Sequence, residues 1–399
     1  MRNTFLSTLC LIFLLALSFK GFPEEAFTIR SYAAVLMDAE TGTLLFAKNK
    51  DEPVPPASLT KLMTIHIALN DVAAGAASLD EPVQLPKESW RVNQPPRSSL
   101  MFLAEGQRVT LRELLLGLAV SSGNDAAVAV AMRCAPSVEE FAARMNAEAA
   151  ALGLSHTAFV EPSGISEYNM TTAYEYAVFC RFYIKTHPET LETLHSVAEF
   201  AYPKPENVPA ASRTRPGTIV QKNRNSLLGV LGVDGLKTGY IDESGYNIAL
   251  TAKQGATRLI AVILGAPAGE EVRDTDGRNL LEWGFSRYKT LYPVMEELPR
   301  VRVWRSKQTY AALTIGEPLP FTARSERGNE LRFETEVLDT ISAPCVKGDR
   351  GGELVLYDSI GELRRIPLLI AENVERGGFL TRLFDAIRLF FMGLRKKNG

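Results

Sequence analysis

The chain has 399 residues, a length that favours one large domain followed by a smaller one. Its formal net charge is −2, from 44 Lys and Arg against 46 Asp and Glu, and this balance argues against a nucleic-acid partner. The 4 histidines and 4 cysteines have no ligand-like spacing, so we expect no metal site and no other cofactor.

The first residues have the pattern of a signal peptide. Arg2 precedes an apolar run from Phe5 to Phe19, and Lys20 closes that run. The run is short for a membrane span, which takes about 20 apolar residues. We therefore predict a signal peptide at residues 1–26 and export of the protein. A retained N-terminal anchor stays open as the alternative, because no clear Ala-x-Ala cleavage site follows.

The first half of the chain predicts a hairpin and several helices. Residues 31–47 alternate around a turn, which is typical of a β-hairpin, and Ser58 to Leu69 has helical character. Two further helices are expected at 111–119 and 126–132, with Asp125 as the cap of the second. Cys134 and Cys180 lie in apolar helical sequence, where buried thiols are the expectation and a disulfide between them is the alternative.

The next part returns to strands. Helical sequence extends from 138 to 194, and a loop rich in Pro and Arg follows at 203–216. Three runs at hairpin spacing then predict consecutive antiparallel strands at 235–240, 245–252 and 259–265. A helix is expected at 276–285. Together these elements predict an α+β fold with helices packed on an antiparallel sheet.

The C-terminal quarter has a different texture. Short alternating runs after Pro299 indicate a small all-β domain, and a glycine pair at 377 and 378 precedes a last helix. This helix is amphipathic, with bulky apolar residues on one side and a basic tail, which favours binding to an anionic membrane surface over packing on the protein. Its apolar side is expected to hold Leu380, Leu383, Phe384, Ile387, Phe391 and Leu394. The expected division is 27–298, 299–375 and 376–399.

Three short motifs carry the chemistry. They are Ser58-Leu59-Thr60-Lys61, Ser122-Gly123-Asn124 and Lys237-Thr238-Gly239, in this order. A pattern that fixes a Ser and a Lys three residues later arises by chance in a chain of this length, and Ser286 with Lys289 is a second match. The function therefore depends on the three motifs occurring together.

These motifs, with Asn223-Arg224-Asn225 and Gly245-Tyr246-Asn247, closely resemble those of the serine D-alanyl-D-alanine carboxypeptidases. These enzymes are the low-molecular-mass penicillin-binding proteins of bacterial cell walls. The resemblance covers roughly residues 30 to 290 and implies a β-lactamase/transpeptidase-like fold. It further implies that backbone N–H groups of Ser58 and Tyr240 form an oxyanion hole.

The residue types suit acyl transfer. Ser58 and Lys61 are three residues apart on a helix, so the Lys61 amine can lie beside the Ser58 hydroxyl and take its proton. This requires that burial and a second cation, expected to be Lys237, lower the pKa of Lys61. Ser122 can relay a proton to the leaving group, and Asn124 can hold a substrate amide. Gly239 lets a substrate backbone approach the strand edge beside Lys237 and Thr238.

A terminal D-alanine carries a carboxylate, and Thr238 and Arg273 are the expected partners for it. Arg273 is assigned through its place after the 259–265 strand, which resembles that of the family's carboxylate-binding arginine. We predict a serine carboxypeptidase that acts through a Ser58 acyl-enzyme on peptidoglycan stem peptides and is acylated by β-lactam antibiotics. Its expected place is the extracytoplasmic face of the membrane, bound peripherally through the C-terminal helix.

Three alternatives remain. A class A β-lactamase needs a Glu that activates the deacylating water, and Glu161 and Glu167 lie in the right region but in the wrong sequence context. A non-catalytic penicillin-binding sensor is disfavoured because Ser58 and Lys61 are both present. Endopeptidase cleavage of wall cross-links uses the same residues and the same bond type, so the sequence does not separate it from carboxypeptidase action.

Overall fold

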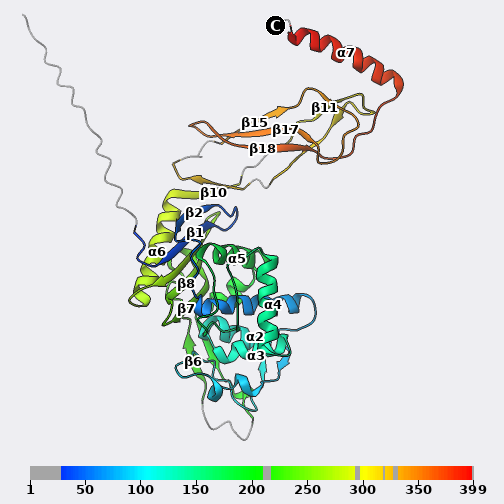
Figure 1. The fold of residues 1–399 in the computed structure, drawn as a ribbon. Helices are drawn as coiled ribbons and strands as arrows, with labels where there is room; N and C mark the ends of the chain where they lie inside the picture. The colour runs from blue at the N-terminus through cyan, green and yellow to red at the C-terminus, as the bar shows by residue number, and fades with distance from the viewer. Residues whose placement is uncertain (1–27, 210–216, 293–296, 318–319, 327–330, 398–399) are drawn as a thin grey trace, which may run out of the picture.

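The structure is a computed structural model that describes residues 28–209, 217–292, 297–317, 320–326 and 331–397. The predicted signal peptide at 1–26 lies outside these residues. A five-stranded sheet in the order β2-β1-β9-β8-β7 forms the centre of the N-terminal part, and every neighbouring pair is antiparallel (Figure 1). Its strands are β1 (Ala33–Asp38), β2 (Leu44–Lys48), β7 (Val233–Ile241), β8 (Gly245–Gln254) and β9 (Thr257–Ala266). The predicted hairpin and the three predicted strands are confirmed.

Helices cover both faces of this sheet. Side chains alternate along a strand, so Val35 and Met37 join one apolar core while Ala34 and Leu36 join another. The first core includes residues of α1 (Lys61–Ala73), α2 (Leu111–Leu116), α3 (Asn124–Cys134), α4 (Val138–Ala151) and α5 (Ala173–Thr186). The second core is closed by α6 (Glu270–Arg287) on the opposite face. The α+β prediction is therefore confirmed.

Several element boundaries differ from the prediction. Helix α6 begins at Glu270 rather than at 276, because Gly269 ends the preceding loop and two glutamates favour the positive end of the helix dipole. The expected helical region at 138–194 is interrupted by a loop at 152–172. The expected loop at 203–216 is flanked by two paired strands, β5 (Glu199–Tyr202) and β6 (Ile219–Lys222), and residues 210–216 lie outside the described part. Cys134 and Cys180 are free thiols, so the alternative disulfide is absent.

A second part has its own apolar core and consists of strands. A four-stranded sheet in the order β13-β18-β17-β15 packs with the order β12-β11-β16 around buried Val301, Leu354 and Ile366. The strands are β11 (Val301–Trp304), β12 (Tyr310–Ala311), β13 (Leu313–Ile315), β15 (Arg332–Val337), β16 (Ile341–Ser342), β17 (Arg350–Tyr357) and β18 (Glu362–Ile370). The predicted all-β domain is confirmed.

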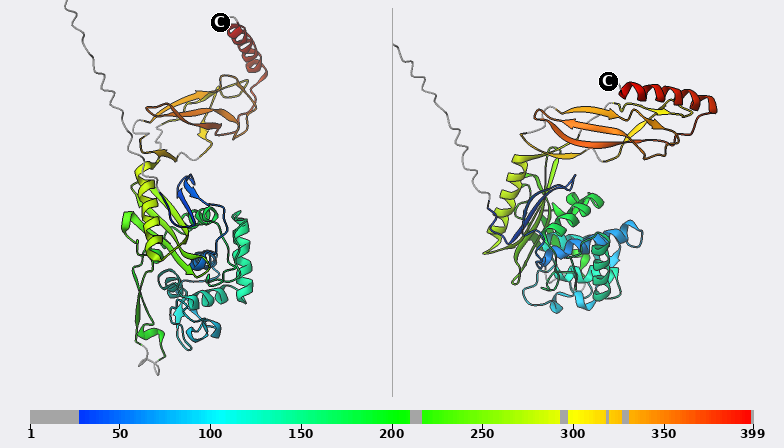
Figure 2. Two further views of the ribbon diagram at one scale, coloured as in Figure 1. Left: turned by 60° about the vertical axis from the view of Figure 1, so that its left-hand side comes forward. Right: turned by 45° about the horizontal axis from the view of Figure 1, so that its top comes forward.

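The two parts meet at a short pair of strands, β10 (Tyr288–Leu291) and β14 (Phe321–Arg324). Buried Asp38 at the end of β1 accepts hydrogen bonds there from Thr290 Oγ1 at 2.6 Å and Thr322 Oγ1 at 2.9 Å. Figure 2 shows the β-domain at one end of the larger domain, with α7 (Phe379–Lys397) at the far side of it.

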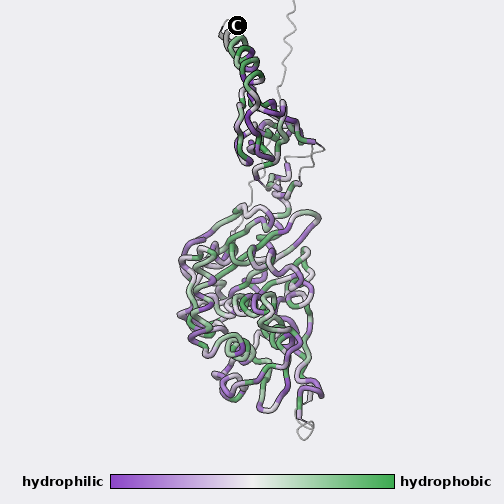
Figure 3. The backbone as a smooth tube through the Cα atoms, turned by 90° about the vertical axis from the view of Figure 1, so that its right-hand side faces the viewer, coloured by the Kyte–Doolittle hydropathy of each residue, from purple (hydrophilic) through white to green (hydrophobic). Residues whose placement is uncertain are grey.

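Helix α7 exposes its apolar residues. Leu380 is 65% exposed and Phe384 61%, and Figure 3 shows hydrophobic and hydrophilic segments alternating along this helix. The backbone N–H of Arg305 donates to Asp385 and links the helix to the β-domain. Within the described ranges, no helix has the length and hydropathy needed to cross a bilayer. The predicted amphipathic helix is present.

Candidate active site

The first motif brings a serine and a lysine into contact. Ser58 lies in a 3₁₀ turn, Ala57–Thr60, and Lys61 is the first residue of α1. Lys61 Nζ lies 2.8 Å from Ser58 Oγ, 2.8 Å from Asn124 Oδ1 and 2.5 Å from the carbonyl oxygen of Ser163. Ser58 remains partly exposed while Lys61 is fully buried. The hydroxyl therefore faces outward with the amine directly beneath it.

Burial lowers the pKa of Lys61 to about 7, although the negative charges of Glu161 and Asp125 oppose this change. The positive charge of Arg224 lowers the pKa further. The sequence prediction assigned this second effect to Lys237. In the structure, the pKa of Lys237 is itself held well below its usual range, first by burial and then by the charges of Lys61, Arg224 and Arg273. An amine with a pKa near neutrality is suited to accept the serine proton.

The second motif lies between two helices, as predicted. Ser122 has a left-handed backbone with φ of 58°, and its Oγ accepts a hydrogen bond from Lys237 Nζ at 2.9 Å. A β-carbon at Gly123 would lie 2.8 Å from the backbone nitrogen of Met101 and 2.7 Å from Asp125 Oδ1, so glycine permits this close approach. Asp125 is not the predicted helix cap. Its carboxylate accepts hydrogen bonds from the N–H groups of Met101 and Leu103.

The third motif lies on β7, at the edge of the sheet. Lys237 is buried, and its Nζ donates to Ser122 and to the Thr238 carbonyl oxygen at 2.8 Å. A β-carbon at Gly239 would lie 3.0 Å from the backbone nitrogen of Ser58, so the strand passes directly beside the serine turn. The next residue, Tyr240, follows on the same edge with 49% of its surface exposed.

A loop that the motifs do not include completes this group. Gly164 has φ of +80°, and a β-carbon there would lie 1.8 Å from the carbonyl oxygen of Ala57. The Glu161 carboxylate accepts hydrogen bonds from the N–H groups of Ser163 and Gly164 at 2.7 and 2.6 Å. Glu161 thus holds the loop that presents the Ser163 carbonyl to Lys61. Sequence reasoning missed this group, because a backbone carbonyl leaves no residue signature.

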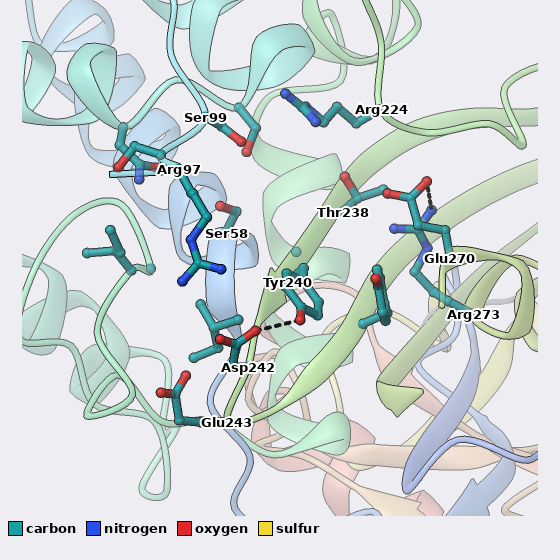
Figure 4. A pocket seen from close by; sticks show the side chains of 18 of the residues that line it. Ser58, Arg97, Ser99, Arg224, Thr238, Tyr240, Asp242, Glu243, Glu270 and Arg273 are labelled. Carbon is teal, nitrogen blue, oxygen red and sulfur yellow. Dashed lines mark hydrogen bonds and ion pairs between the residues drawn. The ribbon is translucent and has the colours of Figure 1, made fainter. Parts of the chain in front are cut away.

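A cavity of about 460 Å³ opens above these groups. Figure 4 shows Ser58, Thr238, Tyr240, Arg224 and Arg273 around it. Of the predicted site residues, its lining holds Ser58, Ser122, Asn124, Thr238, Gly239, Tyr240 and Arg273. Lys61 and Lys237 lie underneath and reach the lining through their bonds to Ser58 and Ser122. The structure therefore brings all nine predicted site residues together.

Arg273 is buried in the first turns of α6 and borders the cavity. Its Nε donates to Asp274 at 2.7 Å, and Glu270 lies 3.9 Å from Nη2. Nη2 makes no hydrogen bond to any described residue. A buried guanidinium nitrogen with an unmet hydrogen bond at the wall of a cavity is suited to an anionic ligand.

Arg224 belongs to the Asn223-Arg224-Asn225 motif, but the sequence did not predict it to be a site residue. It borders the same cavity, and its charge lowers the pKa of both buried lysines. The chance match is elsewhere: Ser286 Oγ is exposed near the end of α6 and donates to the carbonyl oxygen of Trp283. Within the described ranges, no group of three or more acidic, His or Cys side chains is arranged to hold a metal ion.

Comparison with known proteins decides the family. Residues 20–268 match the family model described as D-alanyl-D-alanine carboxypeptidase, and residues 287–376 match that of the penicillin-binding protein 5 C-terminal domain. The chain belongs to the D-alanyl-D-alanine carboxypeptidase family. It is 33% identical to D-alanyl-D-alanine carboxypeptidase DacF of Bacillus subtilis, over 88% of this chain and 87% of that protein.

Solved structures agree with this assignment. Penicillin-binding protein 5 from Haemophilus influenzae has a TM-score of 0.77 and 29% identity, covering 88% of this chain and 98% of that one. Penicillin-binding protein D2 from Listeria monocytogenes, in its ampicillin-bound form, has a TM-score of 0.55 and 31% identity over 64% of this chain and 98% of that one. The family resemblance and the transpeptidase-like fold read from the sequence are confirmed.

Proposed function

We propose that the protein is a serine D-alanyl-D-alanine carboxypeptidase that removes the terminal D-alanine from peptidoglycan stem peptides, with Ser58 as nucleophile. The observation that carries the proposal is the contact of 2.8 Å between Ser58 Oγ and the buried amine of Lys61, whose pKa is about 7. A serine hydroxyl becomes an effective nucleophile when a neighbouring base takes its proton.

The reaction proceeds in two steps. In the first, Ser58 Oγ bonds to the carbonyl carbon of the penultimate D-alanine while its proton passes to Lys61 Nζ. The peptide C–N bond then breaks, and Lys61 passes this proton through Ser122 to the leaving nitrogen of the terminal D-alanine, so that Lys61 is neutral again. In the second step, water attacks the carbonyl carbon of the Ser58 ester and gives up a proton to Lys61. The bond between this carbon and Ser58 Oγ then breaks, Lys61 returns the proton to Oγ, and the shortened peptide leaves as a carboxylic acid.

The cavity supplies the remaining contacts. Backbone N–H groups of Ser58 and Tyr240 are assigned to the developing oxyanion, because β7 passes against the serine turn. The outer edge of β7, with Thr238 and Gly239, accommodates the substrate backbone, and Asn124 holds a substrate amide. Arg273 Nη2 and the Thr238 hydroxyl bind the terminal carboxylate, which supplies the hydrogen bond that Nη2 lacks among the described residues.

The same site would also react with β-lactam antibiotics, which would acylate Ser58. Efficient β-lactamase action requires a carboxylate that positions the deacylating water. Glu161 is the nearest candidate, and its carboxylate is taken up by loop N–H groups at 2.6 to 2.7 Å. Glu167 is exposed on the same loop. This arrangement favours a long-lived acyl-enzyme. Cleavage of cross-links and a sensor role remain the outcomes to exclude.

The deciding experiment measures free D-alanine released from a pentapeptide that ends in D-Ala-D-Ala. The wild type and Ser286→Ala should release it at equal rates, whereas Ser58→Ala should lose roughly 10⁴-fold or more of the activity and all covalent penicillin labelling. Labelling of Ser58→Ala would overturn the nucleophile assignment. Penicillin labelling of the wild type without D-alanine release would move the proposal to cross-link cleavage or to a sensor.

We further propose that the domains divide at 298 and 375, and that α7 holds an exported enzyme at the outer membrane surface. The exposed apolar residues of α7, such as Leu380 and Phe384, support this proposal. Removal of residues 378–399 should abolish cosedimentation with anionic phospholipid vesicles while D-alanine release stays unchanged. Equal vesicle binding by the full and shortened chains would refute the role of the helix.

A further inference from the structure

Among the described residues, strand β7 has one edge that no other strand covers, because it is the last strand of its sheet. In the register with β8, Leu236, Thr238 and Tyr240 lie opposite Leu250, Ile248 and Tyr246. In an antiparallel strand, the carbonyl groups of residues two apart point to the same side. The carbonyls of Leu236 and Thr238 thus point to the same, uncovered edge of β7. A carbonyl that is already bound by another residue is not available to a substrate at this edge.

The Leu236 carbonyl oxygen is taken by His195, whose Nδ1 lies 3.1 Å away. A carbonyl only accepts hydrogen bonds, so Nδ1 carries the proton. His195 Nε2 then accepts from the Tyr183 hydroxyl at 2.8 Å. The ring is buried, and burial first of all lowers its pKa to about 4, so the imidazole is neutral at neutral pH. The donor to Leu236 is therefore constant across the pH range in which Lys61 titrates.

The helical turn Leu191–His195 also holds the segment that carries Arg224. Asn223 Nδ2 donates to the His195 carbonyl oxygen at 3.1 Å, and Asn225 Nδ2 lies 3.3 Å from the Gly235 carbonyl oxygen. A β-carbon at Gly235 would lie 3.2 Å from His195 Cβ, so the turn packs directly on the strand. His195 thus connects the strand that carries Lys237 to the loop that carries Arg224.

We propose that His195 is a positioning residue: its ring fixes the start of the open edge of β7 and holds its own backbone against this strand, and its backbone carbonyl, through Asn223, fixes the distance of Arg224 from the lysine pair. The proposal rests on the proposed function, in which Lys61 must lose its proton. The charges of Glu161, Asp125 and Arg224 act on Lys61, and Lys237 lies near enough for the charge of Lys61 to lower its pKa. When the His195 donor is lost, β7 and the loop that carries Arg224 relax. Arg224 then moves away from Lys61, and the pKa of Lys61 rises.

The test compares substitutions that keep or remove the donor. His195→Asn retains an amide N–H near the position of Nδ1, whereas His195→Gln reaches toward Tyr183 and His195→Leu has no donor. We expect His195→Leu and His195→Gln to lower kcat/KM about 10- to 100-fold, because small misplacements of catalytic groups have effects of this size. They should also shift the acid limb of the pH profile to higher pH. His195→Asn should recover most of the rate and the original limb.

His187→Leu is the matched control. His187 is also buried, its ring contacts Tyr183 at a centroid distance of 5.4 Å, and its Nε2 lies 2.9 Å from His66 Nδ1. It should lower the Tm without moving the acid limb. An acid limb that stays in place in His195→Gln, or moves equally in His187→Leu, would overturn the positioning role. If the wild type releases no D-alanine, the proposed function fails instead, so the two failures are distinguishable.

Discussion

The two parts of the molecule place their charges differently. The larger domain buries Lys61 completely and leaves Lys237 2% exposed, whereas the β-domain keeps Arg365 at its surface with 40% of the side chain exposed. Removing a charge from water is costly, and an exposed ion pair contributes little to stability. The buried lysines are therefore expected to serve chemistry, and the exposed arginine to be dispensable.

The largest effect is expected from Lys61. Because its pKa is about 7, acylation should fall about tenfold per pH unit below that value as the amine becomes protonated, and level off above it. Lys61→Met should lower the acylation rate by about 10² to 10⁴-fold and remove this acid limb, since general bases contribute that much. Penicillin labelling followed from pH 5 to 9 measures both.

Lys289→Met is the control for this experiment, because Lys289 belongs to the chance match with Ser286. It should label with penicillin at the wild-type rate and with the wild-type pH dependence. An unchanged acid limb in Lys61→Met would show that another group accepts the serine proton. In that case the contact between Lys61 and Ser58 would not carry the mechanism.

A smaller effect is expected from Arg273. Its Nη2, which makes no hydrogen bond to any described residue, should bind the terminal carboxylate, and a hydrogen bond to a charged group contributes about 1.5–3 kcal/mol. Arg273→Ala should therefore lower kcat/KM about 10- to 100-fold, mostly through KM. Arg278→Ala, an exposed arginine on the same helix, should change nothing. With a substrate whose terminal carboxylate is amidated, Arg273→Ala should match the wild type; an equal loss on both substrates would contradict carboxylate binding.

Much of this site was readable from the sequence, because its chemistry resides in side chains within short motifs. The spacing of Ser58 and Lys61 and the apolar helix after them predicted a buried amine beside a hydroxyl, and the structure has this contact. The sequence also placed Lys237 and Thr238 on a strand that pairs with the next one along the chain, and the structure has this pair. Hairpin spacing indicates which strands pair.

What the sequence did not predict depends on contacts between distant segments. The Ser163 carbonyl reaches Lys61 across 102 positions, and Arg224 lowers the pKa of Lys61 through space. Asp125 was predicted to be a helix cap because of its place beside a turn, yet its carboxylate binds N–H groups more than 20 residues away. Such partners are chosen by tertiary packing, which local propensity does not encode.

The smallest effect is expected from Arg365, which tests whether an exposed charge of the β-domain is dispensable. Its guanidinium donates to Glu336 and Glu353 at 2.9 Å and to Glu362 at 3.0 Å, so it is the most extensively paired charge of the β-domain's surface in the described ranges. Because solvent and salt screen these pairs, Arg365→Ala should leave D-alanine release within about twofold of wild type. Any loss of Tm should disappear in 1 M salt.

Leu354→Ala provides the contrast within the same domain. Leu354 is fully buried in the apolar core, and removing such a side chain costs about 2–5 kcal/mol. Urea unfolding of both variants, followed in low and high salt, compares the two contributions directly. A loss in Arg365→Ala that persists in high salt and equals that of Leu354→Ala would mean that this surface network, rather than the core, holds the β-domain together. The exposed charges of the β-domain would then not be dispensable, and only the conclusion about the buried lysine pair would stand.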